Sequence, residues 1–288
     1  MLDAAARPEI YREPLSQEQF GIVEKPLTPF ERLYNQGWLR KLFVLAVLAA
    51  SWEAYARWLD NELLVPTFNA TIRALAEGIA GGVILTRAAL SIEVLLMGFG
   101  TGVLVAAVLT FFAINTRIGN DFLETMTAMF NPLPAIALLP LALLWFGLGT
   151  ASLVFVLVHS VLWAVALNTH AGFRSVSVTH RMVGQNYGLR GIGFVVRILI
   201  PAAFPSILAG LKIGWAFAWR TLIAAELVFG TTSGQGGLGW YIFEAKNQLN
   251  IPDVFAGLLS IILIGLFIEN VVFRLIEVRT VRRWGMQN

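Results

Sequence analysis

Long apolar stretches alternate with short polar ones along most of this chain. Six of the apolar stretches suit a membrane span: about 42–58, 88–113, two within 125–173, 205–229 and 254–273. A hydrocarbon core of about 30 Å needs roughly 20 predominantly apolar residues when an α-helix crosses it. The pattern therefore predicts an all-α polytopic membrane protein with six transmembrane helices.

The stretch 125–173 contains no Asp, Glu, Lys or Arg and is too long for one helix. We expect Gly-Leu-Gly-Thr at 147–150 to divide it into two spans. The earlier span is not expected to be a regular helix in its first half, because three prolines lie in it: Pro132, Pro134 and Pro140. Irregular backbone at membrane depth is tolerated only against protein or a water-filled cavity, so this segment is placed beside a pathway.

Gly98 and Gly102 lie four residues apart in the second expected span. This spacing lets two helix backbones approach closely in lipid. Two interpretations stay open: a specific seam between two helices that dimerise, and general packing of small residues.

The segment 177–201 is a polar island between two apolar blocks, and it carries Arg181, Arg190 and Arg197. Its first part predicts a short helix that the Ser177 hydroxyl caps and that Gly188 ends in a left-handed turn. A narrow apolar stripe runs along this helix: Val178, Met182 and Val183. Because such a helix has one face to spare, we expect a docking surface for a partner.

The composition supports the membrane assignment, since 57% of the 288 residues are hydrophobic and 14% are charged. Ordinary soluble domains have about 25% charged residues, so a soluble globular protein is excluded. The chain has no cysteine and three histidines. This excludes a disulfide framework and thiolate chemistry, and it disfavours a metal centre built from several histidines.

Residues 1–38 form a polar, proline-containing N-terminal arm ahead of the membrane domain, residues 39–288. Residues 1–35 hold four Lys and Arg against six Asp and Glu, a net charge of −2, which leaves +5 (17 minus 12) on the rest. The arm either lies on the membrane surface or a partner, or is a disordered tail. No apolar segment follows Met1, so a cleavable signal peptide is not expected.

The distribution of positive charge predicts that both termini are cytoplasmic. With that orientation the inner edges of the spans hold twelve Lys and Arg residues: Arg32, Arg40, Lys41, Arg117, Arg174, Arg181, Arg190, Arg197, Arg274, Arg279, Arg282 and Arg283. The outer edges hold four: Arg57, Arg73, Arg87 and Lys246. Positive residues accumulate on the cytoplasmic side of membrane proteins, so the loop at 174–201 is expected in the cytoplasm.

Ionisable residues within spans are the candidate pathway residues: Arg220, Glu226, Glu93 and His159. A charge near the bilayer centre costs at least about 2.5 to 3.5 kcal/mol and should face a partner or water. Either Arg220 lines a translocation path and attracts an anion, or it forms an internal ion pair with Glu93 or Glu226. For His159, plain hydrogen bonding between helices is the alternative to a pathway role.

No nucleotide site is expected on this chain. Gly234, Gly236 and Gly239 spell G-x-G-x-x-G, but no strand precedes them and no acidic residue follows about 20 positions later. A flexible outer loop that meets a binding protein suits this glycine-rich stretch better. The sequence has no G-x-x-x-x-G-K-[ST] motif for ATP phosphates, so energy for transport would come from another subunit.

The polar island resembles the cytoplasmic loop of permease subunits of ATP-binding-cassette (ABC) importers, in the nitrate, sulfonate, taurine and bicarbonate branch of the type I class. The family motif is Glu-Ala-Ala, three residues, Gly, nine residues and Ile-x-Leu-Pro. Here Gly188 matches the glycine and Ile198-Leu199-Ile200-Pro201 the end, while Met182-Val183-Gly184 stands in place of Glu-Ala-Ala. Further similar stretches are NPLPAIALLPLALLWFGLG (131–149), LNTHAGFRSV (167–176), PAAFPSILAGLKIGWAFAW (201–219), AAEL (224–227) and GLGWYI (237–242).

The resemblance implies the type I importer permease fold, a second permease copy, two ATPase subunits that use the ATP, and a periplasmic or lipid-anchored substrate-binding protein. It implies that this chain binds no cofactor, catalyses no making or breaking of covalent bonds, and works in the inner membrane. The ATPases would dock on Ser177, Val178, His180, Arg181, Met182, Val183, Gly184, Gln185 and Gly188. The cargo implied is a small anion such as a sulfonate, taurine, nitrate, bicarbonate or an aromatic carboxylate, although related permeases carry cationic or neutral thiamine precursors.

Two other classes were weighed. A secondary transporter or channel that works without an ATPase predicts inverted repeats, which the sequence does not contain. An intramembrane enzyme is disfavoured by the lack of cysteine, of a His, Asp and Glu ligand cluster and of an H-E-x-x-H motif.

Overall fold

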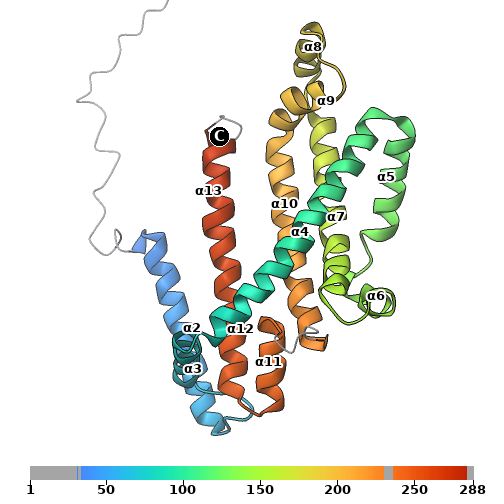
Figure 1. Ribbon diagram of the computed structural model, residues 1–288. Helices are drawn as coiled ribbons and strands as arrows, with labels where there is room; N and C mark the ends of the chain where they lie inside the picture. The colour runs from blue at the N-terminus through green and yellow to red at the C-terminus, as the bar shows by residue number, and fades with distance from the viewer. Residues whose placement is uncertain (1–30, 32–33, 230–235, 284–288) are drawn as a thin grey trace, which may run out of the picture. The chain divides into compact units, whose positions relative to one another are not determined.

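The computed structural model describes residue 31 and residues 34–229 and 236–283, which are helical apart from turns and short connections. In chain order the elements are α2 (Gly37–Leu59), α3 (Phe68–Ala80), α4 (Val83–Asn115), α5 (Arg117–Phe130), η2 (Ala135–Leu138), α6 (Leu139–Phe146), α7 (Thr150–Ser175), α8 (Val178–Asn186), α9 (Gly191–Phe194), η3 (Val195–Leu199), α10 (Ile200–Phe229), α11 (Leu238–Asn247), α12 (Ile251–Phe267), η4 (Ile268–Phe273), α13 (Arg274–Glu277) and η5 (Val278–Arg282) (Figure 1). Nearly all of the N-terminal arm lies outside the described residues, as does Arg32.

The chain divides into two compact units, residues 1–52 and residues 53–288. The described part of the first unit is mainly the first part of α2, whose large apolar side chains are exposed: Trp38, Leu42, Phe43, Val44, Leu45, Val47 and Leu48. Apolar exposure all along a helix is typical of a span that faces lipid.

Within the described residues, five helical segments are long and apolar enough to cross a membrane: Gly37–Leu59, Val83–Asn115, Thr150–Ser175, Gly191–Val228 and Ile251–Arg282. The pair Arg117–Phe130 and Ala135–Phe146, bent by 89°, brings the number to six when it is counted as one broken span. The prediction of an all-α polytopic membrane protein is therefore confirmed, with six spans when the bent pair is counted as one.

The break in the third span lies where the prolines predict it. Residues 131–134 are not helical, a single 3-10 turn follows at η2, and α6 begins only at Leu139. Pro140 lies in the first turn of α6, where its missing N–H would have no partner in any case. Gly147 ends α6 with a φ of 73°, a left-handed conformation that favours glycine, and α7 starts at Thr150.

α7 is the central helix of the second unit. In the most apolar stretch of α7, 56% of the residues are buried, the largest share among the spans of the described residues. α4 and α10 are its main packing partners. A β-carbon at Gly102 of α4 would lie 2.8 Å from Val161 Cβ, and one at Gly98 would overlap the Leu157 side chain. The glycine spacing in α4 therefore serves packing within the chain rather than a seam with a second copy.

α10 approaches the same face of α7 in the same way, since Gly214 also meets Val161. A β-carbon at Gly210 would lie 2.8 Å from Asn168 Cβ, and one at Gly214 would lie 3.1 Å from Val165 Cγ2. Such spacing brings the two backbones close together and increases the dispersion contacts between them. α4 and α10 thus both pack on this face of α7, and each meets it with glycine.

Three sequence expectations need correction. The stretch from Leu238 onwards, expected to be part of an outer loop, is the helix α11. The helical segment of the fifth span begins at Gly191 rather than near Pro205, because α9, η3 and α10 are continuous and Pro205 lies inside α10. The last span extends to Arg282 through two π-helical segments, which sequence periodicity does not predict.

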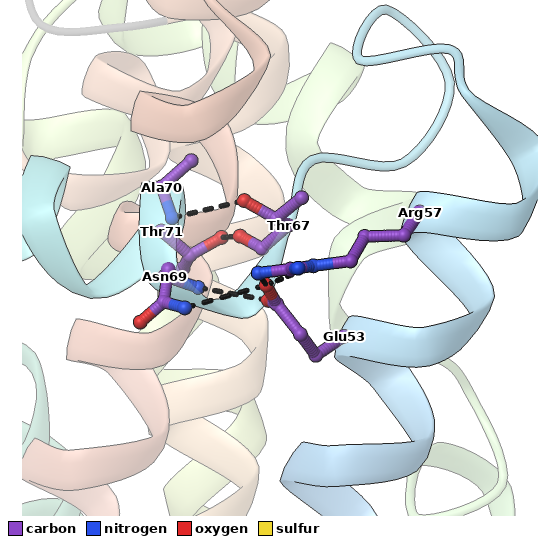
Figure 2. Close-up of polar contacts among 6 residues, drawn as sticks. All are labelled: Glu53, Arg57, Thr67, Asn69, Ala70 and Thr71. Atoms are coloured by element: carbon purple, nitrogen blue, oxygen red, sulfur yellow. Dashed lines mark hydrogen bonds and ion pairs between the residues drawn. The ribbon is translucent and has the colours of Figure 1, made fainter.

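Glu53 breaks the apolar pattern of α2, and its contacts explain its presence. Figure 2 shows its carboxylate accepting hydrogen bonds from Arg57 Nε at 2.8 Å and from the backbone N–H of Asn69 at 3.2 Å. The Asn69 amide adds a third bond at 3.3 Å. Asn69 lies in the first turn of α3, and Thr67 caps this helix, since the Thr67 hydroxyl oxygen accepts a hydrogen bond from the Ala70 N–H at 3.1 Å (Figure 2). The first turn of α3 is thus held both by its own cap and by a carboxylate from α2.

Replacing Gly102 by Leu should destabilise the protein, because the added side chain must displace Val161 of α7. Overpacking of this kind costs about 1–3 kcal/mol. Gly100→Leu is the matched control, since a β-carbon there meets nothing within 4 Å. Thermal unfolding of the purified protein in detergent measures the difference. Equal melting temperatures for the two variants would contradict the α4–α7 packing described.

Candidate functional site

α8 and its flanking residues form a short, firmly capped helix. The Ser177 hydroxyl oxygen accepts a hydrogen bond from the His180 backbone N–H at 3.4 Å and lies 2.6 Å from His180 Nδ1. At the other end Gly188 has a φ of 72°. The Gly188 N–H donates to Gln185 O and the Leu189 N–H to Gly184 O, which is the Schellman arrangement. Both caps expected from the sequence are present.

α8 also contacts the segment that leads into α10. Gly184 is buried, and a β-carbon there would lie 2.9 Å from Ile198 Cγ1 and 2.9 Å from Phe194 Cε2. An alanine at this place in the motif would require those side chains to shift. Gly184, which stands in place of the last alanine of Glu-Ala-Ala, therefore lets α8 pack on α9 and η3 more closely than an alanine would allow.

Arg181 is turned toward the end of α7. Its guanidinium donates to the carbonyl oxygens of Phe173 at 2.6 Å and Val176 at 3.3 Å. A cation is favourable there because the last carbonyls of a helix carry partial negative charge. Of the docking residues expected from the sequence, Arg181 and the buried Gly184 thus hold α8 in place.

Four large apolar side chains are exposed on α8 and just beyond its end. Val178 is 65% exposed, Met182 57% and Val183 46%, and Tyr187 just beyond the helix is 81% exposed. Sequence reasoning missed Tyr187; the signal was a large aromatic residue directly before the glycine that ends the helix. These four side chains are hereafter called the α8 tip.

A cavity of about 380 Å³ lies among the broken third span, α7 and α10. Its walls include residues 131–136 of the break, together with His159, Ser160 and Trp163 of α7 and Phe217, Arg220 and Thr221 of α10. The structure thus brings together two of the predicted pathway residues, Arg220 and His159. The irregular backbone lines a cavity, as the membrane argument requires.

Arg220 is exposed and forms no hydrogen bond or ion pair with any residue that the structure describes. The internal ion pair considered as an alternative is not formed. Glu226 bonds elsewhere, and Glu93 is exposed and has no hydrogen-bond partner in the described part of the chain.

Two further polar side chains of the cavity wall lack partners. Trp163 is 8% exposed, and its indole N–H has no acceptor among the described residues. Both ring nitrogens of His159 are likewise buried without a partner in the described residues. The Trp163 ring stacks on Phe130 of α5, with centroids 5.6 Å apart and an angle of 10° between the planes. Trp163 was not anticipated from the sequence, which offers no signal beyond an aromatic residue four positions after His159.

Glu226 does not line the cavity and is bonded within the fold. It is fully buried, and its carboxylate accepts hydrogen bonds from the Ser91 hydroxyl at 2.9 Å and from the Gly239 N–H at 2.9 Å. The Ser91 oxygen in turn accepts from the Leu238 N–H at 2.9 Å. These two N–H groups belong to the first turn of α11, so the Glu226 carboxyl group lies at the positive end of that helix.

The same region is tied by Arg87 of α4, which donates to Gly236 O at 2.8 Å and pairs with Glu244 at 3.0 Å. A β-carbon at Gly237 would overlap the Ser91 hydroxyl and the Glu226 carboxylate, so only glycine fits. Burial raises the pKa of the Tyr241 phenol, and the Asp253 carboxylate raises it further, so this group of α11 stays protonated. We call Glu226, Ser91 and the first turn of α11 the carboxylate latch.

No group of three or more His, Asp or Glu residues in the described part of the chain is arranged to hold a metal ion. The architecture is that of a polytopic transport protein: apolar helices surround a cavity that is lined by irregular backbone and an unpaired cation. Residues 98–283 match the family described as binding-protein-dependent transport system inner membrane component, and the chain belongs to it.

Individual relatives agree with this assignment. A putative ABC transporter permease protein of Methanocaldococcus jannaschii is 30% identical over 233 residues, which cover 80% of this chain and 86% of the relative. A putative aliphatic sulfonates transport permease protein of Escherichia coli is 28% identical over 233 residues, 79% and 87% of the two chains. A nitrate import permease protein of Synechocystis is 25% identical over 253 residues, 84% and 89% of the two chains.

The protein is therefore a multi-pass inner-membrane permease subunit of an ABC importer, and ATP-binding and substrate-binding subunits are its partners. The resemblance that the 177–201 motif carries is confirmed.

Removing the Ser91 hydroxyl by Ser91→Ala should loosen α11, because the buried Leu238 N–H then has no acceptor. An unsatisfied buried donor costs about 1–3 kcal/mol. Hydrogen exchange at the amides of Leu238 and Gly239 should accelerate by roughly tenfold or more, measured by mass spectrometry. Glu93→Gln, an exposed change two residues away, is the control. Unaltered exchange in Ser91→Ala would show that the latch does not hold the helix.

Proposed function

We propose that this chain is one of two permease copies in an importer that moves a small anionic solute, and that two ATPase subunits dock on residues 177–188. The observation that carries the proposal is the α8 tip: exposed apolar side chains on a helix fixed at both ends. An apolar patch on a capped polar segment outside the spans suits a protein interface. A substrate-binding protein would deliver the solute from the opposite side of the membrane.

The contacts of α8 support a route by which closure of the ATPases would move the spans. Gly184 packs on Phe194 and Ile198 ahead of α10, and Arg181 holds the end of α7. α7 and α10 are two of the elements that line the cavity. A push on the α8 tip when the ATPases close would therefore shift both cavity walls together, which is the coupling that alternating access needs.

The excess of positive charge at the inner edges supports cytoplasmic termini and a cytoplasmic α8. His180 and Gln185 lie exposed beside the α8 tip and would form the polar rim of the docking surface. An anionic cargo is supported by Arg220, which offers an unpaired cation to the cavity. The relatives named for aliphatic sulfonates and for nitrate carry anions by their names.

The competing function is a secondary transporter or channel that needs no ATPase. The two differ in one measurement, since transport by the rival would survive when the ATPase subunits are deleted. The α8 tip favours the ATP-driven importer. Its apolar side chains are exposed outside the spans, which suits an interface with an ATPase, and a channel that needs no ATPase does not require such an interface.

Changing the tip should separate the subunits. Met182→Glu together with Tyr187→Ala is expected to reduce the ATPase that co-purifies with the permease by tenfold or more, because interface anchors of this size contribute about 2 kcal/mol or more. Leu63→Asp, an equally exposed apolar position between α2 and α3, is the control. Full co-purification of the ATPase with the double variant would refute docking at α8.

Arg220→Gln should lower import by the complete complex at least tenfold, while its assembly and its basal ATP hydrolysis stay as in the wild type. The reason is the loss of a charge-assisted hydrogen bond worth about 1.5–3 kcal/mol. Arg274→Gln removes a cation that does not line the cavity and serves as control. Uptake into proteoliposomes measures the effect, and unchanged uptake in an assembled complex removes Arg220 from the pathway.

A further inference from the structure

We propose that the permease binds one phospholipid with an anionic head group at the end of the spans where α8 lies. The phosphate of this lipid lies in a basic cavity among the ends of α4 and α7, α8 and α9. One acyl chain lies in an apolar groove beside that cavity. The inference goes beyond the proposed function, which assigns no role to a lipid.

The basic cavity has a volume of about 240 Å³, and no acidic residue lines it. Arg174 and Arg181 both do. Glu124, which pairs with Arg174 at 3.0 Å, and Asp121, which accepts a hydrogen bond from Asn120 at 3.4 Å, lie outside the lining. Arg181 binds two backbone carbonyls through Nε and one Nη, and its other Nη donates to no described residue. Since a guanidinium offers several N–H groups to phosphate oxygens, the cavity suits a phosphate.

His170 is an independent indication of a ligand. It lines the same cavity and is only 7% exposed, yet its ring forms no hydrogen bond with any residue that the structure describes. Its nitrogens are not sealed from the cavity, in contrast to those of His159. Buried polar groups are nearly always hydrogen-bonded, so a histidine N–H that has access to a cavity is suited to an oxygen atom of a ligand.

The apolar groove adjoins the basic cavity, because Phe173 and Val195 line both. It has a volume of about 490 Å³ and runs between α4, α7 and the segment from α9 to α10. All of its lining residues are apolar except Thr110 and Thr169. Val196 on its rim is 53% exposed, so the groove opens to the outside of the chain.

The depth of the groove fits one leaflet of a bilayer. Its lining along α4 runs from Val103 to Phe111, which is about 12 Å at a rise of 1.5 Å per residue. One leaflet supplies about half of a hydrocarbon core of roughly 30 Å. An acyl chain can therefore run along the groove while its phosphate stays at the membrane surface.

The two features together select an anionic phospholipid. Basic pockets between membrane helices bind the head groups of anionic lipids. A zwitterionic head group brings an ammonium group that the two arginines repel, and a free phosphate leaves the groove uncovered. Because the lipid would touch α7, α8 and η3 at once, it would brace the joint between the docking helix and the spans.

Native mass spectrometry of the purified permease–ATPase complex, delipidated in detergent, tests the site. The probes are phosphatidylglycerol and phosphatidylcholine with identical acyl chains, and glycerol 3-phosphate as a head group without chains. Phosphatidylglycerol should bind at least tenfold more tightly than phosphatidylcholine. Glycerol 3-phosphate should not bind at the same concentrations.

Variants locate the lipid. Arg174→Gln combined with His170→Gln should weaken binding of phosphatidylglycerol at least tenfold, because the phosphate loses a charge-assisted hydrogen bond and a neutral one. Arg197→Gln is the control, since this exposed arginine of η3 does not line the cavity. Ala107→Trp fills the groove from an exposed position and should also weaken binding at least tenfold. Leu104→Trp, exposed on the same helix outside the groove, should bind like the wild type.

The inference is overturned if phosphatidylcholine binds as tightly as phosphatidylglycerol, or if the cavity and groove variants bind like the wild type. Equal binding of glycerol 3-phosphate would overturn it in favour of a soluble phosphate. Loss of a second permease copy in Ala107→Trp, with lipid binding unchanged, would make the groove an interface between copies instead. Arg174→Gln and Ala107→Trp keep the test decisive should His170→Gln not fold.

These outcomes are distinct from those that test the proposed function. A permease on which the ATPases do not dock still binds the lipid if the site exists. A complex that imports with ATP and binds no phosphatidylglycerol would refute the lipid site alone.

Discussion

The close packing of α4 and α10 on one face of α7 is the constraint on which the rest of the structure depends. Gly102 of α4 and Gly210 of α10 let the neighbouring backbones approach α7 so closely that a β-carbon would collide with it. Lipid tails are as apolar as the side chains they would replace, so membrane helices associate through contact of this kind rather than through the hydrophobic effect. The result is one rigid helix that supplies part of the cavity wall and ends beside α8.

The polar groups of the second unit divide into two kinds. Glu226 and Arg87 are satisfied by named partners and tie α11 to α4 and α10. Arg220, Trp163 and His159 lie at the cavity and have no partner among the described residues. Burial without a partner is costly, so the first kind stabilises the fold; of the second kind, Arg220 is exposed and is the group assigned to an anion in the proposed function. The separation assigns opposite roles to Arg220 and Glu226, which lie six residues apart on one helix.

Features set by local sequence were predictable, and those that join distant segments were not. The caps at Ser177 and Gly188 and the break at Pro132 and Pro134 follow from residue type and spacing, because each acts within one turn of backbone. The partner of Glu226 was beyond sequence reasoning, since Ser91 lies 135 positions away in the chain. Arg181 was assigned to docking because its contact with the end of α7 depends on how the chain turns at Val176. α11 was missed because glycines at its start resemble a loop in sequence.

Met182 of α8 stands where the family motif has a glutamate. This difference matters for the pairing of permeases with ATPases in cells that contain several importers of this family. In the proposed docking, the groove on the ATPase that accepts Met182 and Tyr187 would be apolar. Such a groove would gain nothing from the glutamate carboxylate that other permeases of the family carry at this position. A groove built around a cation for the glutamate of the family motif would leave that cation desolvated against Met182. If the ATPases dock as proposed, subunit exchange between importers would be unfavourable in both directions, and a few side chains on and just after a nine-residue helix would keep each ATPase with its own permease.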